Sequence, residues 1–240
     1  MGNVEQTKYV KLGLQSATEF LGMFIFIFLS LGNVQSALYS GGGGNSLAFI
    51  QIALVGLATA IFFSYRISGG ALNPAVNFGL FVAGVMDPLT AVAYTIAQML
   101  GATAACGVVS AIFPGSFKGA NQIFSPTSIA QGFFLEVILT FGLVVTVLFA
   151  AVEKSKVTFY APMLIGVYVF VAHLIAIPYT NTSINPARSF GASIVAGIWT
   201  DHWVFWVGPL LGGAIAGAIH RGYKYVGYEE LNPGQDADHV

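Results

Sequence analysis

Long apolar stretches alternate with short polar segments along this chain. A helix needs about 20 predominantly apolar residues to cross the hydrocarbon layer of a membrane. Two apolar stretches, about 74–84 and 186–197, are too short to span, and each begins at Asn-Pro-Ala. Irregular backbone at membrane depth must be buried in protein or line a wet cavity. The pattern therefore predicts an all-α membrane protein with six transmembrane helices plus two re-entrant half-helices. The six spans are expected at about residues 14–36, 47–65, 89–112, 128–150, 158–178 and 203–222.

The composition agrees with this prediction. Hydrophobic residues make up 56% of the 240 residues and charged residues 8%, against roughly 25% charged residues in soluble domains. A disordered chain is excluded and a soluble enzyme is disfavoured. The net charge of −1 gives a nucleic-acid partner no electrostatic support. Cys106 is the single cysteine, which excludes an intrachain disulfide and a cysteine-based metal cluster. We expect neither a catalysed reaction nor a cofactor.

The basic residues predict the orientation in the membrane. In a six-span chain Lys118 falls on one side, and most other lysines and arginines fall on the opposite side. The residues on that side are Lys8, Lys11, Arg66, Lys154, Lys156, Arg221 and Lys224. The positive-inside rule then places both termini in the cytoplasm. The sequence leaves open whether the membrane is the plasma membrane or that of an organelle.

The two halves of the chain resemble each other. Each opens with a span that bears one acid, Glu19 or Glu136, and reaches Asn-Pro-Ala 54 or 49 residues later. Three spans per half is an odd number, so the second half enters the bilayer from the opposite side. The chain is therefore predicted to be an inverted repeat of residues 13–125 and 126–225. Interrupted segments at matching positions of inverted halves indicate a transport site near the membrane midplane.

The two acids need a reason to lie inside the membrane, because an ionisable residue there costs about 3 kcal/mol even on lenient scales. Glu19 and Glu136 are either proton carriers or structural hydrogen-bond acceptors. The non-helical backbone that precedes each half-helix needs acceptors for its N–H groups. We therefore favour the structural role.

The tripeptides Asn73-Pro74-Ala75 and Asn185-Pro186-Ala187 have a chemical logic. Asn is a strong N-cap and Pro fits the first helical position, so each Asn is expected to start a half-helix. Its side-chain oxygen caps the backbone, and its amide NH₂ stays free as a donor. Two inverted half-helices that meet at the midplane present two such donors and two positive dipole ends to one spot. A water oxygen at that spot accepts from both amides, so its hydrogens point away along the pore. This orientation interrupts the hydrogen-bonded chain of waters along which protons would move, and the positive field of the helix ends repels cations.

The segments that surround these tripeptides resemble the aquaporins, the major intrinsic protein family. The matching segments are SGGALNPAVN at 68–77, INPARSFG at 184–191 and WVFWVGP at 203–209. The resemblance extends over nearly the whole chain. It implies six tilted helices, two half-helices that form a seventh pseudo-span, one pore in each subunit and a homotetramer.

The resemblance also implies a selectivity filter of four positions on the outer side of the pore. Arg188 matches the filter arginine of the family, His173 matches its fifth-helix position, and Thr182 lies three residues before Asn185. Arg188 is permanently charged and offers a rigid fork of five donors. It would deter cations and protons while it donates to water. His173 would narrow the pore and add a polar edge.

The fourth filter position falls in the second span. Counted back from Asn73 as in family members, it is Ala53, where water-selective relatives usually carry Phe. Phe49 is the nearest aromatic residue, and a shifted register would choose Val55 instead. Ala53 in this position implies a filter wider than that of strictly water-selective relatives.

These features predict a passive water channel, driven by osmotic gradients, that excludes protons and ions. One alternative is a glycerol-type channel of the same family for small uncharged solutes such as glycerol, urea and hydrogen peroxide. Ser189 argues against it, because relatives of that type carry Asp there, whereas Ala53 leaves room for it. Two less favoured alternatives are a proton-coupled transporter that uses the buried acids and a non-conducting adhesion protein.

The predicted organisation follows from the spans. We expect a cytoplasmic N-terminal segment at 1–12, a channel domain at 13–225 and a cytoplasmic C-terminal tail at 226–240. Water is the expected permeant, and membrane lipid and other copies of the chain are the expected partners.

Overall fold

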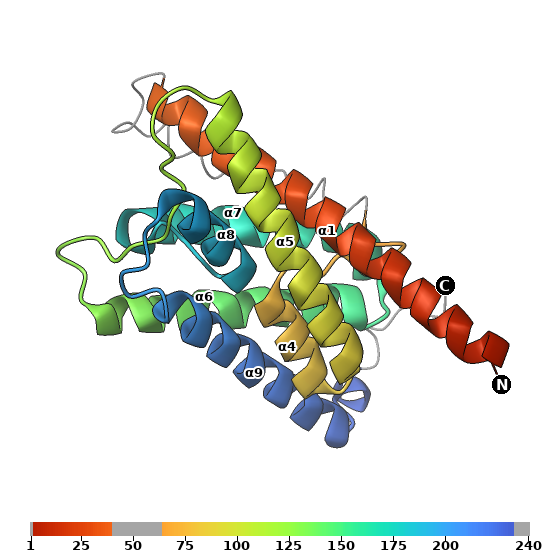
Figure 1. Cartoon of the computed structure of the whole chain (residues 1–240). Coiled ribbons are helices and arrows are strands. Elements are labelled where there is room, and N and C mark those ends of the chain that lie inside the picture. The colour runs from red at the N-terminus through yellow and green to blue at the C-terminus, as the bar shows by residue number, and fades with distance from the viewer. Residues whose placement is uncertain (1, 40–63, 233–240) are drawn as a thin grey trace.

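The computed structural model describes residues 2–39 and 64–232 of the chain, and within these residues every regular element is a helix (Figure 1). The α-helices are α1 (Gly2–Tyr39), α4 (Pro74–Ala83), α5 (Pro88–Ile112), α6 (Ile129–Val147), α7 (Ala161–Thr180), α8 (Pro186–Ala196) and α9 (Val204–Tyr225). Three short helices complete the described elements: a π-helical turn at Leu148–Val152 and 3₁₀-helices at Lys156–Tyr160 and Tyr228–Leu231.

Four helices in the described part of the chain are long and apolar enough to cross a membrane. They cover Thr7–Tyr39, Pro88–Ile112, Ile129–Val152 and Val157–Thr180. The helix α9 matches the sixth predicted stretch with 22 residues but is less apolar, since it contains several glycines and ends in basic residues. The second predicted span, 47–65, lies outside the described residues except for its last two positions. The prediction of a helical, multi-pass membrane protein is thus confirmed.

Two helix boundaries differ from the sequence prediction. The helix α1 begins at Gly2, well before the apolar stretch at 14–36, because no proline interrupts residues 3–13 and the helix simply continues past the apolar part. At the other end, the predicted tail contains the 3₁₀-helix Tyr228–Leu231. A small ionic cluster holds that helix in place, in which Lys224 Nζ donates to Glu229 Oε1 at 2.5 Å and to Glu153 Oε2 at 2.9 Å.

Long helices flank the two short ones. Figure 1 shows α1 beside α5 and α4 against α9, and the short helix α8 packs against α5. Close backbone contacts position the short helices. A methyl group added at Gly213 of α9 would overlap the carbonyl oxygen of Ala75 in α4. A methyl group at Gly191 of α8 would lie 2.7 Å from the carbonyl carbon of Ala102 in α5. Side chains larger than hydrogen would therefore push both short helices away from their supports.

A continuous apolar core connects the helices around these two contacts. Its fully buried members include Met23, Ile27, Cys106, Val144 and Leu148. Polar side chains are also buried, and several of them lie in the segments that lead into α4 and α8, among them Asn73, Thr182, Ser183 and Asn185. The candidate site lies there.

Candidate transport site

The asparagines of the two tripeptides begin the two short helices, as their sequence chemistry predicts. Asn73 is the N-cap of α4, and its Oδ1 accepts from the backbone N–H of Ala75 at 2.8 Å. Asn185 is the N-cap of α8, and its Oδ1 accepts from Ala187 at 3.1 Å and Arg188 at 3.3 Å. In each helix a proline follows the cap, where its missing N–H leaves no helical bond unmade.

The two asparagines also bind each other's helix entry in a reciprocal pattern. Asn73 Nδ2 donates to the carbonyl of Ile184 at 2.7 Å, and Asn185 Nδ2 donates to the carbonyl of Leu72 at 2.9 Å. Each carbonyl belongs to the residue directly before the other asparagine. The sequence predicts that each NH₂ group is free, and this is only half right. One N–H of each group donates to the other half of the chain, and the second N–H stays available.

Left-handed backbone precedes each asparagine. Leu72 has φ +47° and Ile184 has φ +43°, a conformation that costs a residue other than glycine about 1–3 kcal/mol. This turn directs the Leu72 and Ile184 carbonyls toward the opposite asparagine. The hydrogen bonds that the two carbonyls accept from the asparagines, and those that the two N–H groups donate to the buried acids, offset the strain.

The acid of the first half accepts hydrogen bonds from the segment that leads into α4. Glu19 is fully buried, and Oε2 accepts from the backbone N–H of Leu72 at 2.8 Å and from Gln98 Nε2 at 2.8 Å. Its Oε1 accepts from Ser68 Oγ at 2.5 Å and from the N–H of Ala71 at 3.2 Å. Each of the two carboxylate oxygens thus accepts from two donors.

The acid of the second half accepts in the same way from the segment before α8. Glu136 is fully buried, and it accepts from the N–H of Ser183 at 2.9 Å, the N–H of Ile184 at 2.7 Å and Thr180 Oγ1 at 2.7 Å. The backbone N–H groups that lack a helical acceptor thus donate to an acid from the same half. This is the geometry expected of a structural acceptor.

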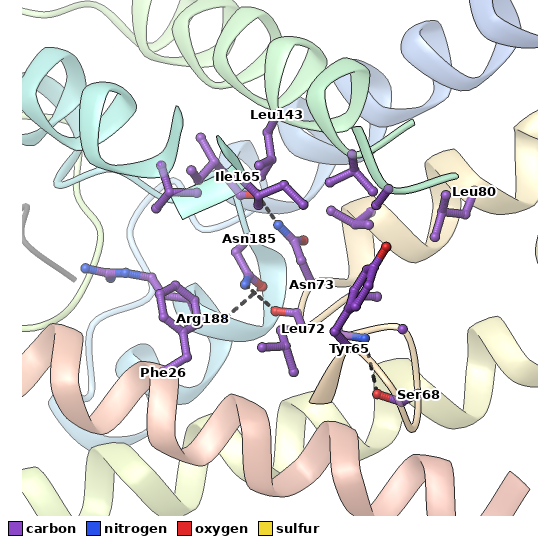
Figure 2. A pocket seen from close by; sticks show the side chains of 18 of the residues that line it. Phe26, Tyr65, Ser68, Leu72, Asn73, Leu80, Leu143, Ile165, Asn185 and Arg188 are labelled. Carbon is purple, nitrogen blue, oxygen red and sulfur yellow. Dashed lines mark hydrogen bonds between the residues drawn. The ribbon is translucent and has the colours of Figure 1, made fainter. Parts of the chain in front are cut away.

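A cavity of about 280 Å³ passes the asparagine pair. Figure 2 shows Asn73 and Asn185 in its middle, with Arg188 on one side and Tyr65 on the other. Its remaining wall is largely apolar. Residues of that wall include Phe26, Val76, Leu80, Leu143, Val147, Ile165 and Val169.

The sequence-predicted residues distribute unequally around this cavity. Asn73, Asn185, His173 and Arg188 line it, whereas the prolines and alanines of the tripeptides are buried in the first turns of α4 and α8 behind the asparagines. Thr182 is fully buried beside this region, its Oγ1 has no hydrogen-bond partner among the described residues, and it is not among the described residues that line the cavity. Ala53, Phe49 and Val55 lie outside the described residues.

His173 and Arg188 both line the cavity, and together they also line a second, narrow space. A separate space of only about 10 Å³ is lined by both residues together with Ser30 and Asn181, which is about the size of one water molecule. His173 Nδ1 lies 2.8 Å from the carbonyl oxygen of Val169. Because a carbonyl only accepts, Nδ1 carries the proton, and Nε2 is left as an acceptor.

Arg188 is 4% exposed and is held by a clamp of oxygen atoms. Its Nη1 donates to the carbonyl of Gly119 at 2.5 Å and to Asn121 Oδ1 at 2.6 Å, and its Nη2 donates to the carbonyl of Asn181 at 3.3 Å. Asn121 Oδ1 also accepts from Ser189 Oγ at 2.8 Å, and Asn121 Nδ2 donates to the carbonyl of Thr180 at 2.9 Å. These hydrogen bonds fix the guanidinium on one side of the asparagine pair, next to the narrow space.

Sequence reasoning missed Asn121, Gln98 and Tyr65. Asn121 lies in the loop between α5 and α6, where an asparagine is ordinary, and its partners are 59 to 68 residues away. Gln98 is a long polar residue within an apolar span, and this position in the sequence is a signal that could have identified it. Tyr65 gives no sequence signal of its own.

Apolar helices surround a buried cavity at which two capped short helices meet, and this arrangement defines a helical multi-pass membrane protein with the architecture of a channel. The model of the major intrinsic protein family matches residues 6–220. The chain belongs to that family, as its motifs predict.

Relatives in fungi are similar over most of the chain. It is 40% identical over 231 residues to a protein named Aquaporin-1 of Gibberella zeae, which covers 92% of this chain and 73% of that relative. It is 41% identical over 242 residues to a Probable aquaporin-3 of the same fungus, with 96% and 85% covered. Aquaporin-7 of Botryotinia fuckeliana is 39% identical, and the chain spans 52% of its length.

One solved structure shares the fold. The X-ray structure of the aquaglyceroporin from Plasmodium falciparum superposes with a TM-score of 0.74 at 24% identity, and the match covers 92% of this chain and 98% of that one. The likeness concerns the fold alone.

Proposed function

We propose that this chain is a passive water channel, driven by osmotic gradients, that excludes protons and ions. The observation that carries the proposal is the reciprocal asparagine pair in the wall of the cavity. This arrangement is rigid on both sides, since each asparagine caps one helix and donates to the entry of the other. The second N–H of each amide is then available to a permeating molecule.

Water suits this pair better than a cation does. A water oxygen that accepts from both amides points its hydrogens away along the cavity, so a proton cannot pass along an unbroken chain of waters. The N-termini of α4 and α8 add positive partial charge at the same spot. The guanidinium of Arg188 contributes a full positive charge next to the narrow space.

The filter is proposed to consist of His173, Arg188, Thr182 and Ala53. His173 offers an acceptor and Arg188 offers donors, so the two sides of the narrow space suit a molecule that both donates and accepts. The contributions of Thr182 and Ala53 rest on the family resemblance alone.

Conduction of small uncharged solutes is the second candidate within the same family. Ala53, where a larger side chain would narrow the filter, is the feature that favours some passage of urea or hydrogen peroxide. Ser189, which donates to Asn121 in the clamp of Arg188, fits the water-selective assignment.

Proton-coupled transport fits the contacts less well. Glu19 and Glu136 are occupied as acceptors for backbone N–H groups, and neither is among the described residues that line the cavity. We therefore infer structural roles for both acids.

The proposal includes an arrangement of the chain in the membrane. Six spans and two half-helices, grouped as inverted repeats 13–125 and 126–225, form a channel domain at 13–225 within a homotetramer. The segment 1–12 and the tail 226–240 lie in the cytoplasm, and the membrane is either the plasma membrane or that of an organelle.

Stopped-flow light scattering of proteoliposomes tests the function. A sucrose gradient should shrink channel-containing vesicles much faster than protein-free vesicles, whereas glycerol and urea gradients should be followed by slow re-swelling. Arg188→Val is the matched variant and should speed re-swelling in urea. Shrinkage no faster than in protein-free vesicles would refute the water channel, and fast re-swelling of the parent in glycerol would favour the second candidate.

A further inference from the structure

Tyr65 lies in the cavity wall on the far side of the asparagine pair from Arg188. Figure 2 shows its ring between Asn73 and Leu80, with the hydroxyl directed away from Ser68. The ring is partly buried and packs against the apolar core, whereas the hydroxyl oxygen is buried. This oxygen has no hydrogen-bond partner in the part of the chain that the structure describes.

Two polar side chains that line the same cavity already have partners within the protein. Ser68 Oγ donates to Glu19 Oε1 at 2.5 Å, and Lys154 Nζ, which is exposed at the cavity rim, donates to the carbonyl of Ala151 at 3.1 Å. The surrounding side chains of this half of the cavity are apolar. They include Leu80, Met86, Val147 and Val152.

Other tyrosines in the membrane part use their hydroxyls differently. Tyr94 donates to the carbonyl of Ser68 at 3.0 Å, and Tyr168 donates to the carbonyl of Leu139 at 2.9 Å. Both bonds stabilise contacts between segments. Tyr65 makes no such bond, although a buried hydroxyl without a partner is unfavourable.

We propose that the Tyr65 hydroxyl is a binding position for permeating water in the half of the cavity away from Arg188, and that it sets the permeability of that half. The inference rests on the proposed water conduction. A water molecule that leaves the asparagine pair enters an apolar section and loses hydrogen bonds. The Tyr65 hydroxyl replaces one of the lost hydrogen bonds, as either donor or acceptor. A single neutral hydrogen bond is weak enough for the water molecule to leave again.

The test is the unit water permeability of Tyr65→Phe in proteoliposomes, normalised to the reconstituted protein. The variant keeps the ring and removes only the oxygen. We expect a drop of about 2- to 12-fold, the effect of one neutral hydrogen bond, with a higher Arrhenius activation energy and an unchanged melting temperature. Tyr168→Phe is the matched control, because its hydroxyl bonds to protein, and it should lower the melting temperature while permeability per channel stays at the parent level.

The outcomes separate the two levels of the proposal. If the parent conducts water and Tyr65→Phe conducts it equally well or better, the role of Tyr65 is refuted while the water channel stands. If the parent itself does not conduct water, the proposed function fails first. A drop in Tyr65→Phe that is matched by an equal drop in Tyr168→Phe would also overturn the inference, because it would reflect a general effect of losing a tyrosine hydroxyl.

Discussion

Replacement of Asn121 by alanine is expected to loosen the filter arginine without closing the cavity. Asn121 Oδ1 accepts from Arg188 Nη1 at 2.6 Å and from Ser189 Oγ at 2.8 Å, and its amide donates to Thr180 at 2.9 Å. Asn121→Ala removes all three bonds at a site that is only 1% exposed. Ser189 keeps Ser183 as a partner at 2.6 Å, so the main loss falls on Arg188.

The size of the effect follows from the bond to the guanidinium. A hydrogen bond to a charged group contributes about 1.5–3 kcal/mol, which corresponds to roughly a 10- to 100-fold change in an equilibrium between two side-chain positions. The remaining acceptors, the carbonyls of Gly119 and Asn181, keep Arg188 nearby. We therefore expect displaced positions of the guanidinium to become populated, not complete loss of the clamp.

Urea permeability and proton leak of proteoliposomes measure this change. Both should rise several-fold in Asn121→Ala, and water permeability should stay within about twofold of the parent because the cavity wall is otherwise intact. Asn121→Asp is the matched control, since it retains the acceptor for Arg188 and should keep solutes out. Exclusion of urea and protons at the parent level in Asn121→Ala would show that Asn121 does not position Arg188.

Three further substitutions test other parts of the account. Asn185→Ala removes a helix cap, worth about 1 kcal/mol, and the hydrogen bond to the opposite half. The melting temperature in detergent should therefore fall, and cation exclusion should weaken. An unchanged melting temperature and unchanged cation exclusion would contradict the role of the reciprocal asparagine pair. Ala53→Phe should cut urea leak and leave most water flux, whereas abolished water flux would show that another side chain fills that position. Burial raises the pKa of Glu153, but the hydrogen bonds and charges of Lys224 and His220 together more than offset this, so the pKa lies below the ordinary value of 4.5. The stability from these contacts of Glu153 should be present above about pH 4.5 and be lost as the pH falls through the lowered pKa. Glu153→Gln should remove that acid-dependent part of the melting temperature.

The short helices are the part of the fold that the sequence predicts best. Their predicted bounds, about 74–84 and 186–197, agree closely with Pro74–Ala83 and Pro186–Ala196. The agreement has a local cause, because an Asn-Pro pair fixes the first residue of each helix and a left-handed glycine, at 84 or 197, ends it. The first span is less well predicted, since hydropathy marks the apolar part of α1 and gives no signal for its continuation back to Gly2.

The contacts that complete the site are not predictable from local patterns. Asn73 and the Ile184 carbonyl are 111 residues apart, and Asn121 and Arg188 are 67 residues apart. Capping chemistry predicts where each asparagine oxygen goes, but its amide partner depends on how the two halves meet. The same holds for Tyr65, whose significance lies in the partner that it lacks.

The most direct test of the central claim measures water and proton movement in the same vesicles. Proteoliposomes that contain a pH-sensitive dye are exposed to an osmotic gradient and, separately, to a pH gradient across a membrane clamped by potassium and valinomycin. We predict fast osmotic shrinkage with dissipation of the pH gradient no faster than in protein-free vesicles. Rapid dissipation that scales with the amount of protein would contradict the account, because the asparagine pair would then fail to interrupt proton movement.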